Sequence, residues 1–342
     1  MLKRLMYKRE KFLAQRDANR IVRPFEWGEE FADSSFIDSE NGASPQSFFE
    51  HYSQNAVQNS SQFYDLDQIL DYRLQDFNLS WTSQITTDSP ANNIVRAGFF
   101  PIEKAPDRKR AVVILPHWNA PAGSYESLCK VFNRVGIAAL RLTLPYHEER
   151  MPPEHDRADF LVSSNIGRTL QSLRQAVVDT RAAVAWLKLQ GFERVGVVGT
   201  SIGSCTGFLA MVHDPNIAAA VYNHVSGYVA DVVWRGVSTY HVREGLGEKI
   251  TLPELRKFWM PISPMAYLNK LKTLPVRPIR FIYTKYDLTF PLDLTLEMMK
   301  EFQRYGIKHE ETVLPCGHYT LGEAPWVYLD GWKIVNFLRK NL

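Results

Sequence analysis

The fold is constrained most by one stretch of the sequence, Arg194-Val-Gly-Val-Val-Gly-Thr-Ser-Ile-Gly-Ser204. Its apolar run at 195–198 predicts a buried strand, and residues 205–213 predict a helix. Between them lies a G-x-S-x-G pentapeptide with Ser201 at its centre. Such a turn presents the serine hydroxyl at its apex, because glycines on both sides let the strand and the helix pass closely without a Cβ clash. Two other interpretations stay open: a small-residue turn in any strand-to-helix crossover, and a glycine-rich nucleotide loop.

Composition places the chain among ordinary globular proteins. Of its 342 residues, 45% are apolar and 23% are charged, which suits one large α/β domain with extensions or two small domains. We find no run as long as a transmembrane helix and no apolar core of a secretory signal near the N-terminus. Cys129, Cys205 and Cys316 have neither disulfide-framework nor zinc-site spacing. We therefore expect a cytoplasmic protein with no metal and no cofactor.

The charge is uneven along the chain. The whole sequence carries a net charge of +3, but residues 1–23 hold eight Lys or Arg and two acidic residues, a local +6 that leaves −3 for the rest. A solvated terminal helix explains this pattern, and so does an arm that touches an anionic surface. We expect no nucleic-acid partner, and we retain weak peripheral membrane contact through the basic N-terminus as an alternative. The oligomeric state is not predicted.

Residues 1–90 are predicted to be a helical extension that packs on a larger body, because their many aromatic residues are unlike a disordered tail. Ser44 and Pro45 are suited to the N-cap and first turn of one helix. Asp65 is suited to cap a second helix over 66–74.

Residues 91–342 are predicted to form one α/β domain, because strand and helix patterns alternate along them. The expected strands are 94–100 (at an edge of the sheet), 111–116, 137–142, 195–198, 217–222, 280–283 and 311–314. The expected helices are 125–134, 166–189, 205–213, 292–305 and 325–340. This order predicts a mainly parallel, twisted sheet with helices on both faces. An aromatic-rich insertion at about 225–273, between the expected strands 217–222 and 280–283, is either a helical lid or covered core.

A serine nucleophile needs a base within hydrogen-bond reach and an acid that orients the base. Asp287 follows the strand after the insertion, and His318 follows the last strand behind a glycine. The order Ser201, Asp287, His318 is the one expected for this arrangement of strands. Asp293 is the second candidate for the acid, although it falls inside the next predicted helix.

On these residues, the stretch 94–342 resembles the α/β-hydrolase superfamily and is most similar to its esterase and dienelactone-hydrolase-like branches. The resemblance implies a Ser201–His318–Asp287 catalytic triad. It also implies an oxyanion hole formed by two backbone N–H groups. One belongs to Ile202, and the other belongs to Trp118 or Asn119 in the loop at the end of the expected strand 111–116. Relatives often have His-Gly where this chain has His117-Trp118, and many have glycine where it has Ser204.

Four further residues fall at predicted carboxyl ends of strands, where the sites of α/β proteins gather. His117, Asn119, Tyr146 and His224 are candidates for substrate binding. The competing interpretation for each is packing. The loop 145–153 could contact substrate or be a solvated charged loop, and no cluster of His, Cys and acidic residues has metal-ligand spacing.

These features together predict a serine hydrolase that cleaves an ester, thioester or related acyl substrate through an acyl-enzyme. The substrate is a small-molecule or lipid-like acyl compound whose identity and acyl length stay open. An acyltransferase with the same triad and a catalytically silent binding or scaffold protein are the alternatives. A peptidase of the prolyl-oligopeptidase type normally adds a large propeller, and the 90-residue extension is too short for one.

Overall fold

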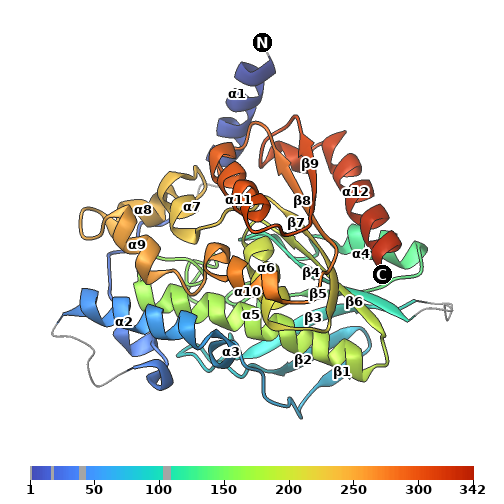
Figure 1. Ribbon diagram of the computed structural model, residues 1–342, viewed down its shortest axis with the longest axis horizontal. Coiled ribbons are helices and arrows are strands. Elements are labelled where there is room, and N and C mark those ends of the chain that lie inside the picture. Colours follow the sequence, from blue (N-terminus) through green and yellow to red (C-terminus); the bar gives the residue numbers. More distant parts are fainter. Residues whose placement is uncertain (1, 17–18, 38–43, 103–108) are drawn as a thin grey trace.

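A mostly parallel sheet lies at the centre of the computed structural model, which describes residues 2–16, 19–37, 44–102 and 109–342 (Figure 1). Within these ranges the strand order is β1-β2-β3-β5-β4-β6-β7-β8-β9. The strands are β1 (Arg73–Gln75), β2 (Asn78–Thr82), β3 (Ile94–Phe100), β4 (Arg110–Leu115), β5 (Ala138–Leu142), β6 (Arg194–Thr200), β7 (Ile217–Asn223), β8 (Ile279–Thr284) and β9 (Glu310–Leu314). The pairs β1–β2, β2–β3 and β3–β5 are antiparallel, and the pairs from β5–β4 to β8–β9 are parallel.

Helices cover both faces of the sheet (Figure 1). They are α1 (Leu2–Gln15), α2 (Pro45–Gln58), α3 (Ser60–Phe63), α4 (Glu126–Arg134), α5 (Ile166–Leu189), α6 (Ile202–His213), α7 (Val229–Arg235), α8 (Tyr240–Leu246), α9 (Leu252–Phe258), α10 (Leu268–Thr273), α11 (Leu292–Arg304) and α12 (Trp326–Asn341). Alternate residues of β4 are buried on opposite faces of the sheet. Val113 packs in the core that contains α5, α6 and α11, and Val112 packs in the core that contains α4 and α12. Burial on both faces explains why the central strands read as continuous apolar runs.

The expected α/β fold is confirmed, but the start of the sheet differs from the prediction. The strand 94–100 was expected at an edge, whereas β3 has β2 on one side and β5 on the other. The hairpin β1–β2 from the N-terminal extension takes the edge instead. Leu79 and Trp81 of β2 are buried with a period of two, so one face of this strand packs in the core, and no strand was predicted here.

The helix expected over 66–74 is also wrong. Residues 65–72 have no regular element, and Arg73–Gln75 belongs to β1. The polar groups here bond to other segments: the Tyr72 hydroxyl donates to Ala182 O (2.7 Å), and the Asp67 N–H donates to the Gln84 side chain (2.8 Å). These long-range hydrogen bonds favour the irregular structure more strongly than the helical spacing of apolar residues favours a helix. The helix that begins at Ser44 and Pro45 is confirmed as α2, with the Ser44 side chain accepting from Ser47 N.

The insertion at 225–273 contains α7 to α10, and it packs against the N-terminal extension. The Ser53 hydroxyl of α2 donates to Phe258 O (2.6 Å), and the Phe49 and Phe258 rings lie 6.3 Å apart. Phe258 and Trp259 are fully buried. The aromatic residues at this contact are therefore core, and a lid movement of the insertion stays a prediction. Within the described residues, none of the helices combines the length and the apolar character that crossing a membrane requires.

Candidate active site

Ser201 lies at a strained turn between β6 and α6. Its φ of 57° and ψ of −119° are unusual for a residue with a side chain, and its N–H donates to Asn223 O (2.8 Å) on the neighbouring strand. The glycines on either side are required sterically. A Cβ on Gly199 would lie 2.2 Å from Gly203 O, and a Cβ on Gly203 would lie 2.4 Å from Leu115 O. The pentapeptide therefore folds as the sequence predicts, with the serine at the apex.

Ser204 replaces a glycine that the resemblance led us to expect, and it has a structural role. Its buried hydroxyl lies 2.6 Å from Ser201 O and 2.7 Å from His224 O. The hydroxyl thus links the first turn of α6 to the residue that follows β7. This link holds the backbone of Ser201 close to that of His224.

Asp287 lies just beyond β8 and is held by its own turn. Its Oδ1 accepts from the N–H groups of Thr289 (2.8 Å) and Phe290 (2.7 Å), and its Oδ2 lies 3.2 Å from His318 Nδ1. Burial opposes ionisation of the carboxyl, but the charges and hydrogen bonds of His318 and His224 outweigh burial and hold the pKa of Asp287 well below its usual value. The carboxylate is therefore ionised and can fix the proton on His318 Nδ1.

A second histidine shares this carboxylate. His224 follows β7, has a positive φ of 57°, and places Nδ1 2.7 Å from Asp287 Oδ2. Burial lowers the pKa of His224, and the nearby His318 charge adds to this effect. A neutral His224 with its proton on Nδ1 donates to Asp287, so both histidines orient toward one oxygen. The two rings lie 4.2 Å apart.

His318 has the exposure that a base needs. Its side chain is 13% exposed, whereas those of His224 and Asp287 are 1% and 2% exposed. The Phe290 ring stacks on the His318 ring at 5.5 Å, with the two planes 2° apart. Among the described residues, no hydrogen bond joins the Ser201 hydroxyl to His318, a separation that is common before a substrate is bound. Asp293, the second candidate for the acid, lies on the surface in an ion pair with Arg235.

The loop after β4 lies against the serine turn, as the contact of Gly203 with Leu115 O requires. Here the Asn119 N–H donates to His147 Nε2 (2.8 Å), and His147 Nδ1 lies 2.9 Å from Pro145 O. Burial lowers the pKa of His147 to about 4, so the ring is neutral with its proton on Nδ1. Because the Asn119 N–H is engaged, Trp118 is the better candidate for an oxyanion donor in this loop. Ile202, at the first position of α6, has an N–H without a helical acceptor.

The four residues expected to bind substrate differ in how deeply they are buried. His117 and Asn119 are half-buried at the loop, where His117 Nδ1 lies 2.7 Å from the Tyr125 hydroxyl. Tyr146 is fully buried beside Phe160. His224 is bonded to Asp287 as described. Substrate contact by these four residues stays a prediction, and the burial of Tyr146 and His224 favours supporting roles for those two.

Two features beside the candidate catalytic residues were not expected from the sequence. Asp330 of α12 accepts from Asn223 Nδ2 (2.8 Å), and burial raises the pKa of Asp330 to about 7. Glu10 of α1 is fully buried against the backbone that follows His318. The second feature had one signal in the sequence, a single acidic residue inside an otherwise basic helix.

His224, Asp287 and His318 also satisfy the geometry of a metal-ion site, because their ligand atoms lie within 4.8 Å of one another. The separations of 2.7 and 3.2 Å between the ring nitrogens and Asp287 Oδ2 are those of N–H···O hydrogen bonds. The donor set is therefore explained by protons on both rings. The expectation of a metal-free protein stays a prediction.

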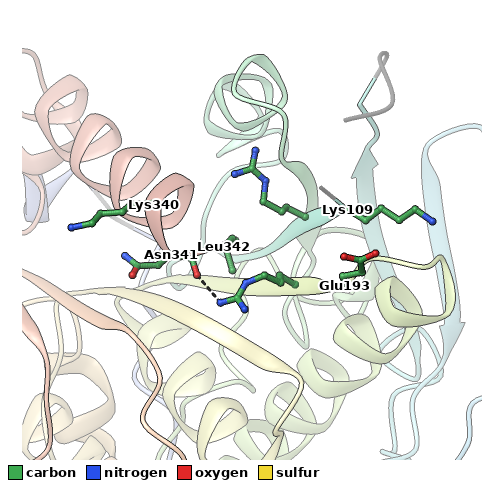
Figure 2. Close-up of a pocket in the computed structure, with 7 residues that line it drawn as sticks. Lys109, Glu193, Lys340, Asn341 and Leu342 are labelled. Atoms are coloured by element: carbon green, nitrogen blue, oxygen red, sulfur yellow. Dashed lines mark hydrogen bonds between the residues drawn. The ribbon is translucent and has the colours of Figure 1, made fainter. Parts of the chain in front are cut away.

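A cavity of about 320 Å³ lies elsewhere, at the amino ends of β4 and β6 and beside the last residues of the chain (Figure 2). It is lined by Lys109, Arg110, Glu193, Arg194, Lys340, Asn341 and Leu342. Arg110 and Arg194 begin β4 and β6, whereas Ser201 follows the end of β6. At about 3.3 Å per residue, a strand of this length separates the cavity from Ser201 by roughly 20 Å. The cavity is therefore not part of the candidate active site.

Comparison with known proteins shows which fold this is. The sequence matches no protein-family model, and no curated protein matches it. Among solved structures, the chain is similar to a Pyrococcus horikoshii acylaminoacyl peptidase (TM-score 0.59, 13% identity, 80% of this chain and 42% of that chain). It is also similar to a cold-adapted esterase from an Arctic intertidal metagenomic library (0.51, 16%, 81% and 100%). A third similar structure is a Mycobacterium tuberculosis puromycin-hydrolyzing peptidase (0.56, 16%, 78% and 39%).

These neighbours include esterases and peptidases, and at such identities they show the fold alone. The chain has the α/β-hydrolase fold, so the resemblance seen in the sequence is confirmed at that level. The chain spans less than half of each of the two peptidases and the full length of the esterase.

Proposed function

We propose that this protein is a serine hydrolase that cleaves an acyl substrate, with an ester as the first class to test. The Asp287–His318 pair follows β8 and β9, in the same sheet whose strand β6 leads into the strained Ser201, and it supports this function most strongly. In the proposed reaction, the Ser201 hydroxyl attacks the acyl carbon while His318 Nε2 takes its proton. The leaving group then receives that proton, and water releases the acyl group from Ser201 in the same way.

The surrounding residues would stabilise each step. Asp287 holds the His318 proton on Nδ1 and stabilises the imidazolium that forms. The N–H groups of Ile202 and Trp118 would donate to the oxyanion of the tetrahedral intermediate, and removal of one such donor typically raises the barrier by about 3 kcal/mol. A neutral His147 bonded to Asn119 keeps the Trp118 loop in place.

An ester is preferred over a peptide because the chain corresponds to the whole of the esterase neighbour but to less than half of each peptidase neighbour. Amide cleavage is the second candidate, because two of the similar structures are peptidases. Acyl transfer to an alcohol would use the same acyl-enzyme, so an added alcohol tests it directly.

Hydrolysis of p-nitrophenyl acetate, butyrate, octanoate and laurate, with matching anilides, tests the proposal. We expect ester turnover that falls by a factor of about 10³ or more in Ser201→Ala. Ser61→Ala is the control, since Ser61 is an exposed serine of α3 whose hydroxyl accepts from Lys270 Nζ. A folded wild-type protein that cleaves none of these substrates, or a Ser201→Ala variant that keeps its turnover, would refute the proposal.

A further inference from the structure

The N-terminal helix α1 places a buried carboxylate on the loop that carries His318. Glu10 is fully buried, whereas its neighbours Arg9 and Lys11 are exposed. Its Oε2 accepts from the Tyr319 N–H (3.0 Å), and its Oε1 accepts from the Thr320 N–H (2.8 Å). The two residues that follow His318 therefore donate to a side chain more than three hundred positions away in the sequence.

The backbone of this loop is shaped to admit the carboxylate. A Cβ on Gly317 would lie 2.3 Å from Glu10 Cδ, so a side chain at this position would displace Glu10. The Gly317 N–H donates to the Thr320 hydroxyl (2.7 Å), which closes the turn around His318. The glycine before the histidine thus serves the contact with α1.

Other contacts of the N-terminal segment reach the loop that carries His318 and also the loop that carries Asp287. The Tyr7 ring lies edge-on to the Tyr286 ring, 6.0 Å away, and Tyr286 immediately precedes Asp287. Arg9 forms an exposed ion pair with Glu323. Arg20 donates to the Tyr319 hydroxyl (2.9 Å). The segment therefore touches the loops of both the acid and the base.

Burying a carboxylate is costly unless its hydrogen bonds are satisfied. Burial raises the pKa of Glu10, whereas the two backbone bonds and the charge of His318 oppose that rise. Cys316, two residues beyond the end of β9, also lies near Glu10. Tyr7 and Arg9 of α1 and Glu323 of the loop after His318 are the other polar groups nearby. The two hydrogen bonds from the Tyr319 and Thr320 amides therefore fix the loop that carries His318.

We infer that Glu10 is a positioning residue of the active site: from α1 it fixes the Gly317–Thr320 turn that carries His318. This inference rests on the proposed function, since it assigns the base to His318. It gives the basic N-terminal helix a role in the same active site, whether or not its exposed face also binds a surface.

Steady-state kinetics of Glu10→Gln test the inference. Glutamine keeps the shape but has one acceptor oxygen and no charge. We expect kcat to fall about tenfold with KM nearly unchanged, because the base is misplaced and the substrate is still bound. Glu10→Asp should recover part of kcat.

Glu323→Gln is the matched control, because it breaks an exposed contact of α1 while leaving the Tyr319 and Thr320 amides bonded. It should stay within about twofold of the wild type. A Glu10→Gln variant that melts earlier but keeps the wild-type kcat would overturn the inference, since Glu10 would then only anchor α1.

A mutation-free measurement covers the case in which Glu10→Gln does not fold. In the wild-type protein, the amide resonances of Tyr319 and Thr320 should shift together as the Glu10 carboxyl titrates above its ordinary pKa of 4.5. Amides that stay constant through that titration would overturn the inference. A folded wild-type protein that is inactive on every ester and anilide would instead refute the proposed function.

Discussion

His224 Nδ1 lies 2.7 Å from Asp287 Oδ2, the same oxygen that lies 3.2 Å from His318 Nδ1. The shorter of the two contacts belongs to the histidine that is buried and follows β7. Asp287 is therefore oriented from two sides, by its own turn and by His224, before it engages the base.

Replacing His224 tests this orientation. We expect His224→Leu to lower kcat by about tenfold or more, because Asp287 Oδ2 loses its shortest hydrogen bond and the carboxylate can rotate away from His318. His224→Asn should retain much of the activity, since its amide can donate from nearly the same place as Nδ1. Equal kcat values in the wild type and His224→Leu would show that His224 only fills space.

The close approach of the serine turn to the loop after β4 predicts a strong steric effect. We expect Gly203→Ala to lower the free energy of unfolding by roughly 1–3 kcal/mol, because the new Cβ would lie 2.4 Å from Leu115 O. Gly331→Ala in α12 is the control. Nothing lies within 4 Å of its Cβ position, so alanine should stabilise the helix by about 0.5–1 kcal/mol. Urea denaturation of both variants measures the difference, and a Gly203→Ala protein as stable as the wild type would contradict the described packing.

Asp330 predicts a distinct dependence of stability on pH. Burial raises the pKa of Asp330 from 3.8 to about 7, so the folded protein keeps a proton that the unfolded chain releases. The stabilising contribution is full below about pH 4 and is lost as pH rises through 7, with a slope of at most about 1.4 kcal/mol per pH unit. The slope should be smaller than this limit because Asp330 is only half-buried by surface area.

Asp330→Asn removes that titration. The melting temperature of the variant, relative to the wild type, should therefore rise steadily from pH 4 to pH 8. Asp293→Asn, at an exposed ion pair, should show no such rise. Parallel melting curves for Asp330→Asn and the wild type across this range would mean that Asp330 ionises normally.

Much of the fold was predictable from the sequence, because strands that are buried on both faces of the sheet are recognisable as apolar runs. The runs at 111–115, 195–198 and 217–222, which became β4, β6 and β7, are continuously apolar, and β5 is interrupted by Arg141 alone. The helix α5 has the same bounds as the expected helix 166–189. The hairpin β1–β2 was missed for two reasons. Short edge strands bury few residues, and the helical spacing of apolar side chains over 66–74 runs into β1. Long-range bonds such as that of Tyr72 decided the local structure there.

The candidate site was predictable as a set of residues and less so as a set of contacts. Ser201, Asp287 and His318 follow strand ends, and strand order alone brings such positions to one edge of a sheet. The pairing of His224 with Asp287, and that of Glu10 with the Tyr319 and Thr320 amides, join residues far apart in the sequence with no local pattern to reveal them. The engagement of the Asn119 N–H by His147 is of the same kind.

Labelling with a fluorophosphonate tests the central claim most directly, because this reagent reacts with an activated serine and needs no knowledge of the substrate. We expect one adduct per chain, located on Ser201 by mass spectrometry, which is lost in Ser201→Ala and kept in Ser204→Ala, whose wild-type hydroxyl is engaged by two carbonyl groups. Reaction should slow in His318→Gln, because the base is absent. A folded wild-type protein that stays unlabelled, or that is labelled at another residue, would contradict the account.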